Sequence, residues 1–273
     1  MPRTNRIAPG GWVFHVLNRG NGRMRIFDKD GDYRAFETLL SESLNRFRLR
    51  LLCYCLMPNH WHLVLWPRAD GDLGRFMQRL TTTHVRRWHL HRHTVGHGHL
   101  YQGLYKSFPI QQDEHFLTVC RYVERNPLRA NLVERAQDWH WSSLSLTTPE
   151  AGGPPRTRAN GEKATTWRTS LEGATLAGRS ALDRGGPGAD GRTAPVVAEA
   201  VRPTISDWPV SRPRQWLAIV NRPQSPAEEE GLRRSVQRGR PFGGSTWEKL
   251  AATRLGLQST LSPRGRPRKE KES

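Results

Sequence analysis

Cysteine is scarce in this chain of 273 residues, which contains only three, Cys53, Cys55 and Cys120. Three thiols cannot build a disulfide framework, and so low a number is typical of a protein from a reducing compartment. Cys53 and Cys55 alternate with Tyr54, and no second cysteine pair follows them. We therefore interpret them as small apolar side chains on one face of a strand rather than as zinc ligands.

The sequence also has no long apolar run, and we expect no N-terminal leader. No stretch is long and apolar enough to predict a membrane-spanning helix or a membrane anchor, so we expect no membrane partner. The first six residues, MPRTNR, lead into a polar segment, which does not predict a signal peptide. We also see no Gly-rich nucleotide-binding loop, which is consistent with a reaction that needs no external energy source.

Acidic residues are outnumbered, with 25 Asp and Glu against 43 Lys and Arg, for a net charge of +18. The excess lies mainly in residues 1–142 and 205–273, while residues 143–204 are nearly balanced. Such a charge predicts a nucleic-acid partner, bound through phosphates and weakened by salt. A general arginine-rich compositional bias is the alternative. The expected location is the cytoplasm, in association with the nucleoid.

The segment Pro58-Asn59-His60-Trp61-His62 is the most informative motif. It lies in a predicted strand, where alternate side chains project to opposite faces, so His60 and His62 point together while Trp61 points into a core. Two imidazoles on a rigid strand are suitable ligands for a divalent metal. Two buried histidines satisfied by hydrogen bonds are the alternative.

A second motif follows at Tyr122 and Asn126, four residues apart on a predicted helix that starts near Asp113. A tyrosine can act as a covalent nucleophile when a nearby metal stabilises its oxyanion. The amide oxygen of Asn126 is a suitable third ligand for a hard cation such as Mg²⁺ or Mn²⁺. A packed tyrosine, with Asn126 capping the helix before Pro127, is the alternative.

Together these motifs resemble the HUH nucleases, in which two histidines flank a hydrophobic residue, and within them the single-tyrosine transposases. The resemblance is strongest to the REP-associated tyrosine transposases of bacteria. It rests on four blocks, residues 15–20, 57–64, 101–108 and 122–130, and on shorter C-terminal stretches at 216–221, 238–243 and 264–267. One position departs, because insertion-sequence relatives usually have Gln where Asn126 stands.

The resemblance implies an enzyme that nicks and rejoins single-stranded DNA at imperfect palindromic hairpins through a 5′-phosphotyrosine. In that mechanism Tyr122 is the nucleophile, and His60, His62 and Asn126 hold Mg²⁺ or Mn²⁺. Candidate contacts to the DNA backbone within the first domain are Lys106, Arg121, Arg125 and Arg129. We expect a monomer, with a homodimer that exchanges the tyrosine helix as the alternative.

Two other classes of function stay open from the residues alone. One is a non-catalytic DNA- or RNA-binding protein on the same fold, and the other is a metal hydrolase that uses water as its nucleophile. A rival metal site is the His97-Gly98-His99 segment of a histidine-rich stretch. Its central glycine predicts a flexible turn, which positions ligands poorly, so we interpret it as a solvated loop.

Hydrophobic periodicity predicts an α+β domain in residues 1–142. Strands are expected at 11–19, 51–57, 61–66 and 101–110, and helices at 30–47, at 72–91 and around Tyr122. The order βαββαβα is the ferredoxin-like pattern, an antiparallel sheet with helices on one face.

The rest of the chain divides into a linker and a basic C-terminal region. Residues 143–204 contain 9 Gly and 6 Pro, which predicts disorder with one helical turn near 196–201. Residues 205–273 predict short helices at 216–221, 228–237 and 246–254. Arg264 and Arg266 belong to a segment that resembles an AT-hook for the minor groove, or else form an ordinary basic tail. We expect this region to add DNA affinity, with regulation by folding back over the site as the alternative.

Overall fold

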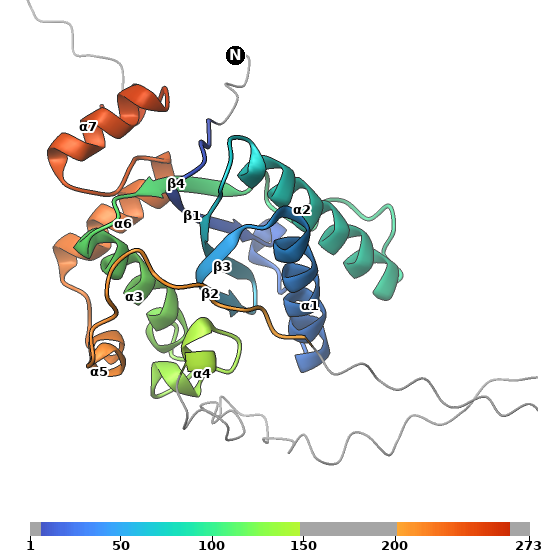
Figure 1. Cartoon of the computed structure of the whole chain (residues 1–273). Helices are drawn as coiled ribbons and strands as arrows, with labels where there is room; N and C mark the ends of the chain where they lie inside the picture. Colours follow the sequence, from blue (N-terminus) through green and yellow to red (C-terminus); the bar gives the residue numbers. More distant parts are fainter. Residues whose placement is uncertain (1–6, 148–200, 263–273) are drawn as a thin grey trace, which may run out of the picture.

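The computed structural model describes residues 7–147 and 201–262. They include a four-stranded sheet, and Figure 1 shows helices on both of its sides. The order along the sheet is β2-β3-β1-β4, and every neighbouring pair is antiparallel. This order confirms the predicted ferredoxin-like pattern. The strands are β1 (Val13–Arg19), β2 (Arg50–Met57), β3 (His60–Trp66) and β4 (Lys106–Ile110).

Strand β4 is shorter than predicted. Residues 101–105, which we expected to begin it, form a loop that pairs with the end of β1 through a bridge between Tyr101 and Gly20. The side chain of Asn18 donates a hydrogen bond of 3.4 Å to the carbonyl oxygen of Gly103 in the same loop. The loop therefore stays beside the end of β1 that enters the candidate site.

The two long predicted helices, α1 (Asp30–Phe47) and α2 (Asp72–His91), have the predicted bounds and pack against each other on one face of the sheet. The expectation that all helices share that face is wrong, because α3 (Glu114–Arg129) covers the other face. Two consecutive residues of β2 show that helices cover both faces of the sheet. Tyr54 donates a hydrogen bond of 2.6 Å to Glu37 of α1, whereas the Cys53 thiol lies 3.8 Å from the Cys120 carbonyl oxygen of α3.

The strands need cover on both faces because both sets of alternating side chains are apolar. From Leu51 to Met57, every residue of β2 is buried. A sheet with two apolar faces has to bury each of them, and α3 supplies the second layer.

Helix α3 begins where the sequence predicts. The Asp113 side chain accepts a hydrogen bond of 2.9 Å from the backbone N–H of His115, which caps the first turn. The helix does not stop at Asn126 but continues through Pro127 to Arg129. Proline is tolerated there because, so close to the end, few backbone hydrogen bonds are lost.

The first packed unit extends beyond residue 142. Helix α4 (Ser143–Thr147) follows the short 3-10 helix η2 (Ala136–Asp138), and both Ser143 and Leu144 are buried. Most of the predicted linker, residues 148–200, lies outside the described residues, as do Arg264 and Arg266. Val201, the last residue of the predicted helical turn, is exposed and not helical.

The three short C-terminal helices are confirmed as α5 (Trp216–Asn221), α6 (Pro226–Arg238) and α7 (Ser245–Arg254). This region packs on the first unit and not apart from it. Backbone hydrogen bonds join Ser206 to Leu51 at 2.8 Å and Phe242 to Pro109 at 2.9 Å. The two edge strands of the sheet are thus each contacted by C-terminal residues. The remaining 3-10 helices are η1 (Asn21–Arg23) and η4 (Gln258–Thr260).

None of the helices in the described ranges combines the length and the apolar character that crossing a membrane requires.

Candidate active site

The register of β1 against β3 builds one wall of the site. His62 pairs with Leu17 and His60 pairs with Arg19, so these four side chains share the face that α3 covers. Trp61 points to the opposite face, where its indole donates a hydrogen bond of 3.0 Å to the Tyr101 hydroxyl. The structure therefore confirms the predicted alternation, with His60 and His62 on one face of the sheet and Trp61 on the other.

The two histidines lie side by side, with ring centres 5.0 Å apart, and both are buried. The Nδ1 of His60 lies 2.6 Å from the side-chain oxygen of Asn59. An amide oxygen can only accept, so His60 Nδ1 carries the proton and Nε2 keeps its lone pair. Asn59 thus orients the first imidazole, as a second-sphere partner does in metal sites.

His62 is held from two sides. Its Nδ1 lies 2.9 Å from Nε2 of His15 on β1, and its Nε2 lies 2.8 Å from the amide nitrogen of Asn126 on α3. Asn126 is 3 % exposed. The strand motif and the helix motif, 64 residues apart in sequence, therefore meet in one buried contact.

Tyr122 lies one helical turn before Asn126 and closes the site from above the sheet. Its ring meets the His62 ring edge-on, with centres 5.7 Å apart, and the His15 ring at 6.3 Å. Arg129 donates a hydrogen bond of 3.3 Å to the Tyr122 hydroxyl. The phenol oxygen is thus beside a cation, at the edge of the histidine pair.

Burial keeps the imidazoles neutral. Loss of hydration lowers the pKa of His60 to about 3, with Arg19 and Arg129 adding to the effect. Burial also lowers the pKa of His62 well below its ordinary value, and the other histidines and arginines around it act in the same direction. A metal binds neutral imidazole, so both rings are in the required form at neutral pH.

The residues present fit a divalent cation, with one rearrangement. His60 and His62 offer two nitrogen lone pairs, and Asn126 offers an amide oxygen. In the structure that oxygen accepts a hydrogen bond of 3.4 Å from Arg129, while the amide nitrogen faces His62. Ligation through oxygen therefore requires the Asn126 amide to turn and exchange its two ends.

The predicted DNA contacts fall into three groups. Lys106 pairs with Leu17 and so lies on the face of the sheet that holds the site, while Arg129 is within it. Arg121 and Arg125 instead donate to backbone carbonyl oxygens of the C-terminal region, at Pro223 (2.6 Å) and Asn221 (2.7 Å). These contacts tie α3 to the C-terminal region, and a role in DNA binding stays a prediction for both residues.

The rival histidine stretch does not converge on one point. His84 is buried, with its Nδ1 2.5 Å from the Tyr101 hydroxyl, and His89 contacts Thr94. His97 and His99 are exposed in the loop after α2. A different cluster, Asp113, Glu114 and His115, brings ligand atoms within 4.8 Å of one another, but Asp113 is already used as the cap of α3.

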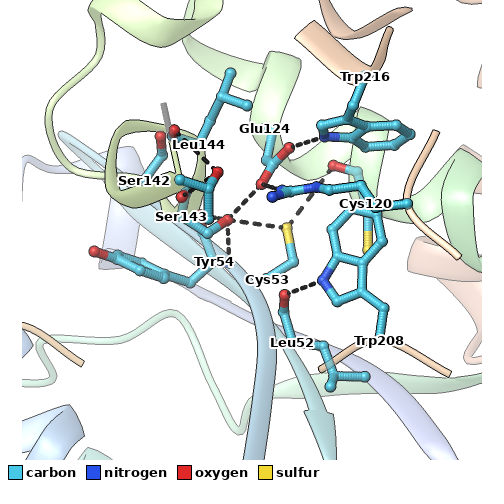
Figure 2. Close-up of polar contacts among 12 residues, drawn as sticks. Leu52, Cys53, Tyr54, Cys120, Glu124, Ser142, Ser143, Leu144, Trp208 and Trp216 are labelled. Carbon is cyan, nitrogen blue, oxygen red and sulfur yellow. Dashed lines mark hydrogen bonds and ion pairs between the residues drawn. The ribbon is translucent and has the colours of Figure 1, made fainter. Parts of the chain in front are cut away.

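Sequence reasoning missed three features of the site. His15 and Arg19 belong to a block that we matched, but we gave neither a role; alternation along β1 from Leu17 was the available signal. The third is a buried cluster around Glu124 that fixes α3 (Figure 2). The carboxylate accepts hydrogen bonds of 2.7 Å from Ser143 and 2.7 Å from Trp216.

The cluster around Glu124 joins three parts of the chain. Figure 2 shows Ser143 on one side of the carboxylate and Trp216 on the other, with Cys53 of β2 below. Arg212 lies 3.5 Å from the same carboxylate. Burial raises the pKa of Glu124, while Arg212 acts to lower it. Since Glu124 is two residues from Tyr122, the cluster fixes the height and rotation of the helix that bears the tyrosine.

The site thus combines an antiparallel sheet in the ferredoxin-like order with a buried histidine pair that faces a tyrosine on α3. The model of the family "Transposase IS200 like" matches residues 11–126, and this part of the chain is an IS200-like transposase domain. The matched segment contains His60, His62, Tyr122 and Asn126. The chain accordingly contains a transposase domain.

Two solved structures are similar to the chain. One is a REP-associated tyrosine transposase bound to a REP hairpin, 16 % identical, with a TM-score of 0.46, covering 60 % of this chain and 94 % of that one. The other is a putative transposase from Deinococcus radiodurans R1, 19 % identical, with a TM-score of 0.33, covering 45 % and 96 %. No curated protein matches the chain.

Proposed function

We propose that this transposase nicks and rejoins single-stranded DNA through a 5′-phosphotyrosine on Tyr122, with a divalent cation at His60 and His62. The observation that carries the proposal is the convergence on His62, whose ring meets Tyr122 at 5.7 Å and Asn126 at 2.8 Å. A tyrosine that served only packing would not need a buried pair of neutral imidazoles beneath it.

In the proposed reaction the Tyr122 oxygen attacks the scissile phosphorus, and the bond from phosphorus to the 3′ oxygen breaks. The DNA 5′ end is then esterified to Tyr122, and the hydroxyl proton ends on the released 3′ oxygen. Arg129, 3.3 Å from the phenol oxygen, stabilises negative charge as it develops there. Attack by another 3′-OH on the phosphotyrosine reverses the step and rejoins strands without an external energy source.

When bound by His60, His62 and Asn126, Mg²⁺ or Mn²⁺ supplies Lewis-acid polarisation of the phosphate. The protein residues hold the substrate around that point. Arg19 faces the site beside His60, and Lys106 lies two strands away on the same face, so both are candidate contacts for the phosphates that flank the cleaved one.

A hairpin with an unpaired flank is the proposed substrate. The resemblance of four ordered sequence blocks to REP-associated transposases supports it, and the relative described above is bound to a REP hairpin. Unpaired bases are open to stacking and to edge contacts. The phosphates of such a strand are attracted by a protein with a net charge of +18.

A monomer is the proposed active form, since one chain supplies every candidate residue. Tyr122 contacts His15 and His62 of the same chain, so the helix need not be exchanged with a second copy. Light scattering after size exclusion, with and without hairpin DNA, tests this point directly.

The decisive experiment is a search for a covalent adduct. Full-length protein is incubated with labelled hairpin oligonucleotides and Mn²⁺, and denaturing gels separate protein-linked label. We expect an adduct from the natural protein and none from Tyr122→Phe, which keeps the ring and loses only the nucleophile. Tyr33→Phe, a matched loss of one hydroxyl on α1, on the opposite face of the sheet, should behave like the natural protein.

The gel also separates the two alternative functions. Nicking without any adduct would identify water as the nucleophile and a metal hydrolase. Binding without nicking would identify a non-catalytic DNA-binding protein. Either result would overturn the proposal.

A further inference from the structure

His15 is a fully buried polar residue in the middle of the sheet that the proposed reaction does not use. It lies on β1, is 0 % exposed, and its ring is nearly parallel to that of His62, with an interplanar angle of 12°. Phe108 packs against its other side, with ring centres 4.9 Å apart. A leucine or phenylalanine would satisfy such surroundings better, so the imidazole calls for an explanation.

The positions of the protons follow from the neighbours of His62. The oxygen of the Asn126 amide accepts from Arg129, which leaves the amide nitrogen as the donor toward Nε2 of His62. His62 Nε2 is therefore an acceptor. A neutral imidazole has one proton, so that proton lies on Nδ1 and is donated to Nε2 of His15 over 2.9 Å.

The same logic continues into His15. Since its Nε2 accepts, its own proton must lie on Nδ1, and that atom is buried with no hydrogen-bond partner. A buried donor without a partner lowers stability. The fold therefore retains an imidazole at this position at a cost, and the contact with His62 is the only hydrogen bond that His15 makes through its side chain in the described parts of the chain.

We propose that His15 is a positioning residue that fixes His62 as the Nδ1–H tautomer and so keeps the Nε2 lone pair directed into the site. Free imidazole side chains prefer the opposite tautomer, with the proton on Nε2. A ligand histidine of a metal site usually donates its second N–H to a carboxylate or a carbonyl oxygen. Here a second, buried histidine takes that part, and Asn59 does the same for His60.

This inference rests on the proposed function only where it concerns the cation. The tautomer itself is a property of the metal-free protein and can be measured there. The two claims can therefore fail separately.

The test is a long-range ¹H–¹⁵N spectrum of the full-length, EDTA-treated protein with ¹⁵N-labelled histidine at neutral pH. The natural protein should show His62 protonated on Nδ1, assigned by loss of its signals in His62→Asn. In His15→Phe the proton should move to Nε2. His15→Gln can still accept from Nδ1–H through its amide oxygen, so it should restore the natural pattern.

Two results would overturn the inference. One is a natural protein in which His62 has its proton on Nε2, which needs no variant to observe. The other is His15→Phe, folded by circular dichroism, that keeps the proton on Nδ1. The signals of His84, a buried histidine on the opposite face, serve as an internal control and should not change.

Calorimetric titration with Mn²⁺ connects the tautomer to the metal. Loss of a partner of this kind weakens metal binding by about 10- to 100-fold, so His15→Phe should fall in that range and His15→Gln within about 3-fold of the natural protein. Equal affinities for all three proteins would contradict a positioning role. Absence of Mn²⁺ binding by the natural protein would count against the proposed function and leave the tautomer result intact.

Discussion

Arg129 and Tyr122 form a pair in which the guanidinium group serves both the ring and the hydroxyl. The guanidinium carbon lies 4.8 Å from the centre of the Tyr122 ring, and one of its nitrogens donates to the phenol oxygen over 3.3 Å. The two residues are seven apart, or two turns of α3, so the helix itself sets their distance. The Tyr122 hydroxyl and the Arg129 guanidinium group therefore move together.

Replacing Arg129 with Gln should slow formation of the adduct by about 100-fold, because a charged donor near the developing oxyanion is lost. Single-turnover rates at saturating DNA measure the effect without a contribution from affinity. Arg34→Gln, a matched change on the exposed side of α1, should leave the rate within about 2-fold. A rate for Arg129→Gln equal to that of Arg34→Gln would show that the pair has no role in the reaction.

The Asn126 amide should decide how tightly the cation binds. Asn126→Asp replaces a nitrogen that faces His62 by a second oxygen and adds a negative charge, so Mn²⁺ affinity should rise on the order of 10-fold. Asn126→Ala should lower it, though less than His60→Ala does. Calorimetric titration gives all three values. The assignment of Asn126 as a ligand fails if Asp and Ala at this position both bind Mn²⁺ as the natural protein does.

The buried carboxylate of Glu124 should be a major source of stability for α3. Glu124→Ala leaves Arg212 without its partner and the donors of Ser143 and Trp216 unsatisfied, and it should lower the free energy of unfolding by about 3–5 kcal/mol. Urea denaturation measures the change. Glu42→Ala, which removes an exposed partner of Arg87, should cost less than about 1 kcal/mol. Similar losses of stability for the two variants would contradict the claim that the Glu124 cluster in Figure 2 stabilises α3.

Acid should destabilise the protein through its buried histidines. Burial lowers the pKa of His84 to about 3, against about 6.5 in an unfolded chain. Between these values the unfolded state binds more protons, so this contribution is complete above pH 6.5 and is lost as the pH falls toward 3.

At pH 5 the loss from one such histidine is about 2 kcal/mol. The side chain of Gln in His84→Gln can still accept a hydrogen bond from the Tyr101 hydroxyl, but it does not titrate. Between pH 7 and pH 5 the free energy of unfolding should therefore fall by about 2 kcal/mol less for this variant than for the natural protein. Urea denaturation of both proteins in EDTA, across that range, measures the difference. Parallel pH profiles would show that His84 is not held neutral by burial.

Local pattern predicted much of this fold. Periodicity gave the bounds of α1 and α2 because each has a stripe of buried residues, and α6 was recognisable because it begins with a capping box. Alternation around Trp61 predicted that His60 and His62 share a face. Helical spacing predicted the same for Tyr122 and Asn126.

Contacts between distant segments could not be predicted in this way. A buried histidine such as His15 has no local signature, since its meaning depends on a neighbour 47 residues away. The same holds for Arg121 and Arg125, which look like exposed basic residues on a helix but donate to the backbone of the C-terminal region. Helix α3 covers the second face of the sheet because β2 is buried on both sides. In the sequence, the only indication of that second buried face was the pair of small apolar residues at Cys53 and Cys55.

The most direct test of the central claim is tandem mass spectrometry of the covalent adduct. Protein is incubated with a hairpin oligonucleotide and Mn²⁺, digested with nuclease and protease, and searched for a peptide that retains a nucleotide through a 5′ phosphate. The account predicts that the modified residue is Tyr122, in the peptide that also contains Glu124. A nucleotide on any other tyrosine, or cleavage that leaves every tyrosine unmodified, would contradict it.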